Sequence, residues 1–288
     1  MQLYLYGKSG HNFGLENIRR LSAIYDMLKE FDPILCTADY RAATYAKQYL
    51  QVDKGVGVDV IGNLPHAMER GDMLIFDDSK EASPTMKSHM DDFCTNLYEF
   101  GKDIPFDIVH NQYFNHTDIK HQKAIFFSDD DYSNYFFNLV KNSSKIDMPL
   151  IWGHYFFLKN EDLIRSKFSE IFEEDDYVDM IKSTKYLLTS SVNSCLESIA
   201  SGNNPVYFKR LDKELIENIE LLEKYNIPTI SEEKLDSLEN IVAEFEKIIQ
   251  NYPETKAIKQ IDISRMKEEI AKTTKLFETI KPSLEYKL

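Results

Sequence analysis

The 288-residue chain alternates short apolar segments with longer amphipathic ones, and this alternation runs through it twice. In the first series, strands are predicted at residues 3–6, 33–36, 56–61, 73–76 and 106–109, and helices at 16–30, 40–50 and 84–100. In the second series, strands are predicted at residues 123–127, 150–152, 186–188, 206–208 and 228–230, and helices at 132–141, 160–172, 176–182, 212–225, 234–249 and 264–280. A repeated strand–helix order predicts an α/β protein with parallel sheets that are covered by helices on both faces.

Two α/β series of this length suit two domains, each large enough to bury its own core. A polar stretch at residues 110–122, rich in histidine and asparagine, is the predicted linker. We therefore expect a Rossmann-like domain at residues 1–115 and a second domain at residues 116–288, and the last helix could pack back on the first domain. In open α/β sheets ligands bind at the carboxyl ends of the strands, so candidate site residues are sought there.

The net charge of −14 argues against broad, nonspecific affinity for nucleic acid or anionic membrane, which needs clustered basic side chains. A local basic strip remains an alternative, formed by Arg19, Arg20, Arg41, Lys47 and Lys54. No run approaches the roughly 18 apolar residues of a membrane span, and the first residues predict a strand rather than a signal peptide. The three cysteines show no metal-binding or redox spacing. We therefore expect a cytoplasmic protein with reduced thiols.

The stretch between the predicted strands at 186–188 and 206–208 carries the strongest functional pattern. A small-polar turn precedes a short predicted helix, and a Gly-Asn-Asn-Pro break follows it. Small residues let backbone N–H groups approach a phosphate, and the helix N-terminus adds the positive end of its dipole. A glutamate one turn into the helix is placed to accept hydrogen bonds from a ribose diol. The predicted nucleotide-binding residues are Ser190, Ser191, Asn193, Ser194 and Glu197; the alternative is an ordinary α/β unit without a ligand.

Two more predicted strands of the second series end in candidate binding residues. Ser128 opens an acidic run at residues 128–131 and could face a phosphate. Capping of the next helix by Asp131 or Ser128 explains the acidic residues better than a metal does, so no metal site is expected. Gly153 and His154 end another strand, where a glycine lets a base approach the backbone. The alternative for this segment is the edge of an aromatic core.

The first series supplies two candidate bases. His11 lies on the first strand–helix loop, between Gly10 and Gly14, and could activate a hydroxyl or water or bind a phosphate. Asp78 follows the predicted strand at 73–76 and could deprotonate an acceptor hydroxyl. The alternatives are a loop histidine without a role and an aspartate that caps a turn. The histidines of the predicted linker lack the spacing of a zinc site.

Together these residues resemble the GT-B superfamily of nucleotide-sugar enzymes. The stretch at residues 189–206 resembles the superfamily's Gly-Gly-Ser-Thr-x-x-Glu…Gly-x-Pro motif, and the likeness is closest over residues 123–248. The resemblance implies two Rossmann-like doubly wound domains facing a cleft, with the acceptor in the first and the nucleotide sugar in the second. It implies metal-independent transfer of a sugar from a nucleotide sugar, expected to be UDP-linked, without a further cofactor.

Two branches of the superfamily fit parts of the chain. Ser9-Gly10-His11 and the Asn-Gln pair of the linker resemble the UDP-sugar hydrolase of pseudaminic acid biosynthesis, whose histidine activates water. The C-terminal part from residue 195 is similar to phage glucosyltransferases that act on hydroxymethylated DNA, which implies Asp78 as the base. A glycosyltransferase is the favoured prediction, with a hydrolase and a non-catalytic nucleotide-sugar-binding protein as alternatives. The acceptor stays open between a glycan, a small molecule and modified DNA.

Overall fold

The computed structural model describes residues 1–78, 82–156, 159, 161–213 and 218–285. The chain forms two compact units, each built from separate stretches of sequence. The first unit comprises Met1–Ser9, Asn17–Ile108 and Gln260–Leu288, and the second comprises Gly10–Glu16 and Val109–Lys259. The loop that carries His11 is thus part of the second unit, and the C-terminal helix is part of the first.

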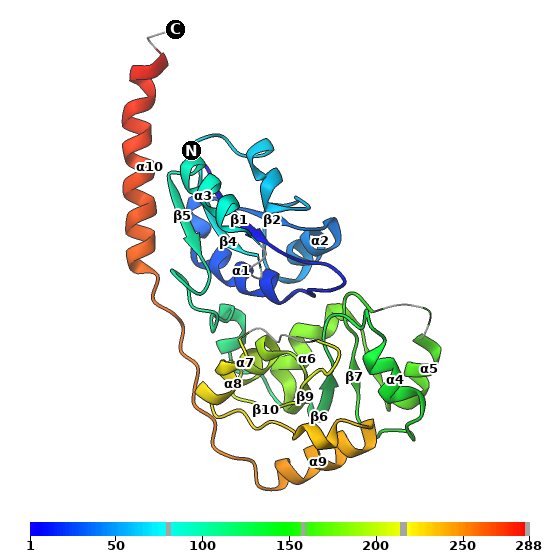
Figure 1. Cartoon of the computed structure of the whole chain (residues 1–288). Coiled ribbons are helices and arrows are strands. Elements are labelled where there is room, and N and C mark those ends of the chain that lie inside the picture. The colour runs from blue at the N-terminus through cyan, green and yellow to red at the C-terminus, as the bar shows by residue number, and fades with distance from the viewer. Residues whose placement is uncertain (79–81, 157–158, 160, 214–217, 286–288) are drawn as a thin grey trace. The chain divides into compact units, whose positions relative to one another are not determined.

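The first unit contains a five-stranded parallel sheet in the order β3-β2-β1-β4-β5 (Figure 1). Its strands are β1 (Leu3–Gly7), β2 (Ile34–Thr37), β3 (Gly55–Gly57), β4 (Met73–Asp77) and β5 (Asn96–Glu99). Its helices are α1 (Glu16–Met27), α2 (Tyr40–Tyr49), α3 (Pro84–Phe93) and α10 (Ser264–Glu285), with 3-10 helices η1 (Lys29–Phe31) and η2 (Ile61–His66). Strand residues of alternating position face α3 and η2 on one side of the sheet. On β1, a Cβ at Gly7 would lie 2.5 Å from Leu21 of α1, so this helix packs directly over the strand.

The second unit contains another five-stranded parallel sheet, in the order β10-β9-β6-β7-β8. Its strands are β6 (His121–Phe126), β7 (Leu150–Ile151), β8 (Ile171–Phe172), β9 (Thr184–Thr189) and β10 (Asn204–Tyr207). Its helices are α4 (Tyr135–Lys141), α5 (Glu161–Lys167), α6 (Tyr177–Ser183), α7 (Val192–Ala200), α8 (Glu220–Lys224) and α9 (Leu238–Gln250), with 3-10 helices η3 (Asn111–Phe114), η5 (Glu174–Asp176) and η6 (Glu232–Lys234). An aromatic-rich core joins one face of the sheet to α4, α5 and α9. On the other face, the ring of Tyr177 on α6 meets Phe126 of β6 at 4.8 Å between centroids.

The structure confirms the predicted α/β class with two doubly wound parallel sheets, but several predicted elements were wrong. The helix predicted at 84–100 ends at Phe93, and Asn96–Glu99 form strand β5 alongside β4. Residues 106–109, predicted as the fifth strand, form no strand. The segment predicted as one helix at 160–172 forms the shorter helix α5 and then strand β8. The helix predicted at 212–225 is seen only as α8, because residues 214–217 lie outside the residues that the structure describes. Among the described residues, no helix has the length and apolar character needed to cross a membrane.

Candidate functional site

The carboxyl ends of four strands of the second unit come together at one edge of its sheet. Ser190, after β9, donates a hydrogen bond from its hydroxyl to the carbonyl of Phe127, which follows β6. The backbone N–H of Ser190 donates to the same carbonyl at 3.0 Å. After β10, Arg210 donates to the Ser128 hydroxyl at 3.1 Å. The structure therefore brings Ser128 and Ser190 to one edge, where parallel sheets bind ligands.

Gly153, which follows β7, allows an unusually close approach of two backbones at this edge. A Cβ at this position would lie 2.3 Å from the Ser128 carbonyl oxygen and 2.6 Å from the Phe156 ring. No real Cβ tolerates such a contact with backbone, so the position requires glycine. The group that packs closely against Gly153 is therefore the backbone of Ser128 in the same chain.

The N-terminus of α7 begins at the same edge and is capped within the chain. Ser191 is the N-cap residue, and its hydroxyl accepts a hydrogen bond from the Ser194 N–H at 3.1 Å. The two hydroxyls of Ser191 and Ser194 lie 2.8 Å apart. The cap satisfies one of the N–H groups that a helix start leaves unpaired. The small-polar turn thus forms the predicted strand–turn–helix junction.

Glu197 lies inside a buried hydrogen-bond network rather than on an open surface. Its side chain is 2 % exposed. One carboxylate oxygen accepts from the Tyr177 hydroxyl at 2.5 Å and the other from the Asn193 amide at 2.8 Å. The Tyr177 hydroxyl also lies 2.7 Å from that of Ser194. Four predicted binding residues, from Ser191 to Glu197, are therefore linked through Tyr177, which sequence reasoning missed because it lies on a different helix.

A second missed residue, Arg210, is the centre of an ion-pair cluster at the ends of β6 and β10. Its guanidinium is 3 % exposed and contacts Asp130 at 3.1 Å and Asp212 at 2.6 Å. It also lies over the Phe127 ring, 4.7 Å from the centroid. Burial opposes its charge, but the hydrogen bond to Asp212 and the charge of Asp130 raise the pKa of Arg210 above its ordinary value. Lys213 adds a second cation, 3.2 Å from Asp130.

The acidic run after β6 has structural partners in the described residues. Asp131 accepts hydrogen bonds from Phe136 N–H at 2.8 Å and Phe137 N–H at 2.9 Å, in the first turn of α4. Asp131 therefore accepts hydrogen bonds from the start of the helix, as predicted, although α4 begins three residues later than predicted and Asp131 is not its N-cap residue. Burial raises the pKa of this carboxyl to about 6, although the two backbone hydrogen bonds oppose the shift. Asp129 accepts a hydrogen bond from Leu15 N–H at 3.0 Å, which fixes the loop Gly10–Glu16 on this unit.

The two predicted histidines of the site have aromatic and acidic neighbours. His154 is buried, and its Nδ1 lies 2.6 Å from a Glu174 carboxylate oxygen. The exposed ring of His11 meets Tyr155 edge-on, with 5.2 Å between the centroids. Tyr155 N–H in turn donates to the Asp129 carbonyl at 2.7 Å. His11 is therefore held in the unit that carries the serine-rich edge.

Asp78, the other candidate base, belongs to the first unit. Its carboxylate accepts a hydrogen bond from Ala82 N–H at 2.6 Å, as an aspartate that shapes a turn does. It also lines a hollow of about 250 Å³ at the ends of β1 and β4, together with Tyr6 and Lys8 and with apolar residues of η2 and α3. Residues 79–81, which follow it, lie outside the described residues. His11 and Asp78 thus occupy different units.

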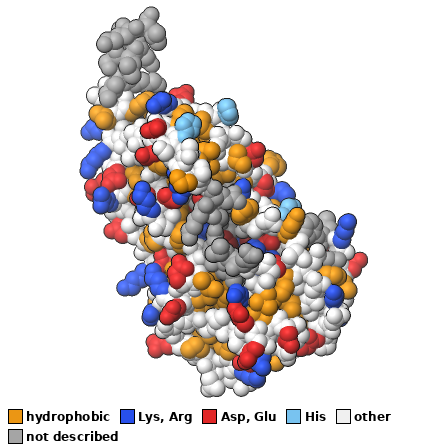
Figure 2. Space-filling model, viewed as in Figure 1, with side chains coloured by type: hydrophobic (Ala, Val, Ile, Leu, Met, Phe, Trp, Pro, Cys, Tyr) orange, Lys and Arg blue, Asp and Glu red, His pale blue; other side chains and the backbone are white. Residues whose placement is uncertain are grey.

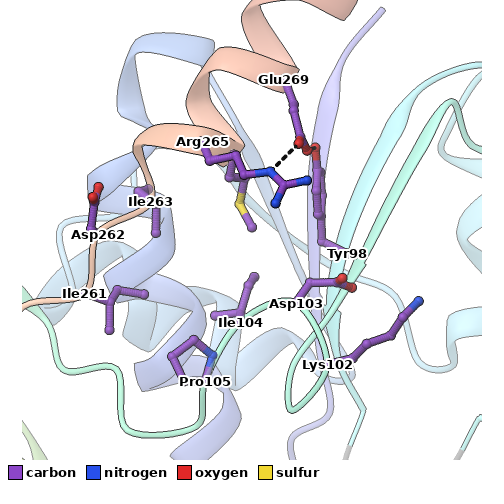
Figure 3. Close-up of a pocket in the computed structure, with 11 residues that line it drawn as sticks. Tyr98, Lys102, Asp103, Ile104, Pro105, Ile261, Asp262, Ile263, Arg265 and Glu269 are labelled. Atoms are coloured by element: carbon purple, nitrogen blue, oxygen red, sulfur yellow. Dashed lines mark hydrogen bonds and ion pairs between the residues drawn. The ribbon is translucent and has the colours of Figure 1, made fainter.

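Another hollow of the first unit, of about 430 Å³, lies between the loop after β5 and the start of α10 (Figure 3). Glu269 accepts hydrogen bonds there from the Tyr98 hydroxyl at 3.3 Å and from Arg265 at 3.0 Å. Burial, with the charge of Glu269, raises the pKa of Tyr98 to about 12. These polar groups bind one another and join α10 to the sheet, and no predicted site residue lies among them.

The local basic strip, an alternative to a surface of mixed charge, loses two of its five members to burial and a third to an ion pair. Arg19 and Arg20 are buried, and Arg20 pairs with Asp77 at 2.8 Å. Lys54 pairs with Asp32. On the face shown in Figure 2, basic and acidic side chains are interspersed. Within the described residues, no group of three or more His, Cys, Asp or Glu side chains is arranged to hold a metal ion.

The fold is similar to those of several solved structures. The Staphylococcus aureus MnaA–UDP structure aligns with a TM-score of 0.51 at 9 % identity, over 87 % of this chain and 89 % of that chain. The Escherichia coli heptosyltransferase WaaC with ADP-2-deoxy-2-fluoro heptose gives 0.46 at 10 % identity, over 86 % and 99 %. The glycosyltransferase SnogD from Streptomyces nogalater gives 0.48 at 11 % identity, over 88 % and 97 %. No family model and no curated protein sequence matches the chain. The two parallel sheets and the likeness to MnaA show that this chain has the GT-B fold, built from two Rossmann-like units.

Proposed function

We propose that this protein is a glycosyltransferase that uses a nucleotide sugar, with the donor site on the second unit and the acceptor site on the first. The observation that carries the proposal is the serine-rich edge, where Ser128, Ser190 and the capped start of α7 meet. Hydroxyls, backbone N–H groups and a helix N-terminus suit the phosphates of a nucleotide. MnaA, which shares the fold, was solved with UDP, and a UDP-linked donor is therefore the first to test.

The diphosphate leaving group needs positive charge in this proposal. Arg210 and Lys213 supply it beside the Ser128 hydroxyl, where positive charge stabilises the charge that develops on a leaving group. Both cations also neutralise Asp130, so a bound diphosphate competes with this carboxylate for them. The proposal assigns no role to a metal ion.

The proposed contact of Glu197 with a ribose diol requires a rearrangement. Both carboxylate oxygens already accept hydrogen bonds, from Tyr177 and Asn193. A ribose hydroxyl can replace Tyr177 only if the phenol moves away. Without that movement, Glu197 acts by holding the Ser191–Ser194 turn through Tyr177.

Asp78 is the proposed base for the acceptor hydroxyl, because it lines a hollow at the carboxyl edge of the first sheet. One observation favours the second candidate function, hydrolysis of the nucleotide sugar. His11 belongs to the second unit, against Tyr155 and close in sequence to the Leu15–Asp129 contact. A base on the donor-binding unit is suited to activate water at the donor itself.

The test combines donor binding with product analysis. Ser128→Ala is expected to weaken UDP affinity roughly tenfold in calorimetry, because a hydrogen bond to a charged group is lost. Ser166→Ala, which removes a hydroxyl that bonds within α5, is the matched control and should bind UDP unchanged. With a UDP-sugar and acceptors, Asp78→Asn should abolish transfer, whereas His11→Asn should abolish release of free sugar only if hydrolysis is the activity. Equal UDP affinity of Ser128→Ala and the parent protein would contradict the donor site.

A further inference from the structure

A second hollow lies at the carboxyl edge of the first sheet, after β2 and β3, and no role has been assigned to it above. Its volume is about 500 Å³, and it is open to solvent. The polar and aromatic side chains that line it are Asp39, Tyr40, Asp59, Asn63 and His66. Edges of this kind hold ligands in parallel sheets, so the hollow lies where a substrate is expected.

Tyr40 gives this hollow an exposed aromatic wall. Tyr40 is 78 % exposed, more than any other large apolar side chain in the part of the chain that the structure describes. Its backbone is fixed as the first residue of α2, because Asp39 caps the helix by accepting a hydrogen bond from Ala42 N–H at 3.1 Å. The side chain of Tyr40 therefore extends from a fixed backbone position at the rim. Gly57, the last residue of β3, lies next to the Tyr40 backbone, where a Cβ would be 3.5 Å from Tyr40 N, and it adds no side chain to the hollow.

The two carboxylates of the hollow are held in place by hydrogen bonds. Asp39 accepts from the Ser9 hydroxyl at 2.7 Å. Asp59 accepts from Val60 N–H at 3.0 Å and from the Asn63 amide at 2.7 Å. Both of these bonds to Asp59 use one of its oxygens, and a carboxylate has more acceptor sites than these bonds occupy, so Asp59 can also accept from ligand hydroxyls. Side chains that hydrogen bonds already hold in place lose little conformational entropy when a ligand binds.

The charge of the hollow selects against phosphate-rich ligands. Among the described residues that line it, none is lysine or arginine, and two are aspartate. Nucleic acid binds through neutralised phosphates, which this wall would repel. An uncharged ligand with many hydroxyls and an apolar face matches it, because hydroxyls donate to the Asp59 carboxylate while the C–H face packs on the Tyr40 ring. Saccharides have this chemistry.

We propose that this hollow binds an uncharged saccharide portion of the acceptor, so that the acceptor is a glycan rather than DNA. The inference rests on the proposed transferase function. The segment Val58–Asn63 lines both this hollow and the one that contains Asp78, with Val58, Asp59 and Asn63 in the first and Val60 to Gly62 in the second. A glycan that lies across this segment places its reacting hydroxyl at Asp78 and its next sugars at Tyr40.

The experiment measures binding of neutral gluco-, manno- and chito-tetraoses to the whole protein by calorimetry, with UDP binding measured in parallel. Tyr40→Ala is expected to weaken saccharide affinity roughly tenfold, and Tyr40→Phe to retain it, while UDP affinity stays unchanged in both. Leu276→Ala, which removes another exposed apolar side chain on α10, is the control and should leave both affinities unchanged. Asp59→Asn should weaken saccharide binding without changing UDP affinity.

The remaining outcomes distinguish a failure of the saccharide site from a failure of the proposed transferase function. If none of the tetraoses binds while UDP does, the saccharide inference is overturned and the donor site stands. Saccharide binding that Tyr40→Ala leaves intact also overturns it, as does tighter binding of an oligothymidylate that depends on Tyr40. Saccharide binding that depends on Tyr40, in a protein that binds no nucleotide, supports this site and overturns the transferase proposal.

Discussion

A buried carboxylate such as Glu197 is costly unless donors surround it. The Tyr177 hydroxyl and the Asn193 amide supply those donors, and the Ser194 hydroxyl extends the network to the cap of α7. The same atoms therefore stabilise the helix start and position the residues proposed to face the nucleotide. Loss of one donor should affect both stability and binding.

We predict that Tyr177→Phe lowers the free energy of unfolding by about 1–3 kcal/mol, because a buried acceptor loses its partner. Urea denaturation at neutral pH measures this. Tyr132→Phe, at a 55 % exposed residue, is the control and should change stability by less than about 0.5 kcal/mol. If Glu197 binds ribose, Tyr177→Phe should also bind UDP at least as tightly as the parent. Equal stability of the two phenylalanine variants would contradict the network.

The raised pKa of Asp131 predicts the sign of a pH dependence of stability. This pKa of about 6 in the folded protein exceeds the ordinary value of 3.8, so the folded state holds the Asp131 proton more tightly. The stability from this group is complete below the ordinary value and is lost as the pH rises through about 6. The loss amounts to about 3 kcal/mol by linkage.

Asp131→Asn removes this titration. We predict that the free energy of unfolding of the parent, minus that of the variant, falls by about 3 kcal/mol as the pH rises from well below 3.8 to well above 6. Denaturant titrations at a series of pH values measure the difference. Parallel pH profiles for the two proteins would show that Asp131 titrates normally.

At the scale of elements, the junctions after the strands decide the geometry of the site. Gly153 and Ser190 bring the ends of β7 and β9 onto the backbone that follows β6. We predict that Gly153→Ala lowers the free energy of unfolding by about 1–3 kcal/mol, because the added Cβ overlaps the Ser128 carbonyl. Gly55→Ala, whose Cβ would meet only ordinary contacts from 3.4 Å outward, is the matched control. Calorimetric unfolding of both variants measures the effect, and equal values would contradict the close approach.

The sequence predicted most of the elements because their apolar periodicity is strong, and it failed where tertiary contacts decide. Apolar residues at helical spacing continue through residues 84–100 without a glycine or proline after Pro84, yet pairing with β4 turns Asn96–Glu99 into a strand. Residues 106–109 are apolar apart from Asp107 but pack as a loop, with Phe106 against Gly101 and under the Arg20 guanidinium. Local pattern alone cannot distinguish these cases.

The same distinction applies to the site. Ser191 and Asp131 could be predicted to accept hydrogen bonds from the start of a helix because their partners lie within six residues. The pairing of Arg210 with Asp130 could not be predicted, because the two residues lie 80 positions apart in the sequence. The sequence did not indicate a functional role for Tyr177, because a tyrosine on the apolar face of a short helix is equally expected in the core. For Arg210, the only sequence feature that pointed to a role was its position after a predicted strand.

At the scale of the whole molecule, the first unit depends on the far end of the chain. Helix α10 belongs to it, with Ile270 fully buried and Lys267 paired to Glu30 at 2.9 Å. We predict that Ile270→Ala lowers the free energy of unfolding by about 2–5 kcal/mol through loss of packing. Leu276→Ala, at a residue that is 61 % exposed on the same helix, should change it by less than about 0.5 kcal/mol. Chemical denaturation of both variants measures this, and similar losses would show that α10 does not pack as described.

The central claim is that the second unit binds a nucleotide sugar, and ligand-dependent unfolding of the whole protein tests it most directly. The protein is heated with UDP, ADP, GDP, CMP and dTDP and with their sugar conjugates, without added metal. The account predicts that one nucleotide series stabilises the protein, by about 2.7 kcal/mol at a ligand concentration of about 100 times Kd, and that Ser128→Ala reduces this gain. Unchanged unfolding with every member of the panel would contradict the account.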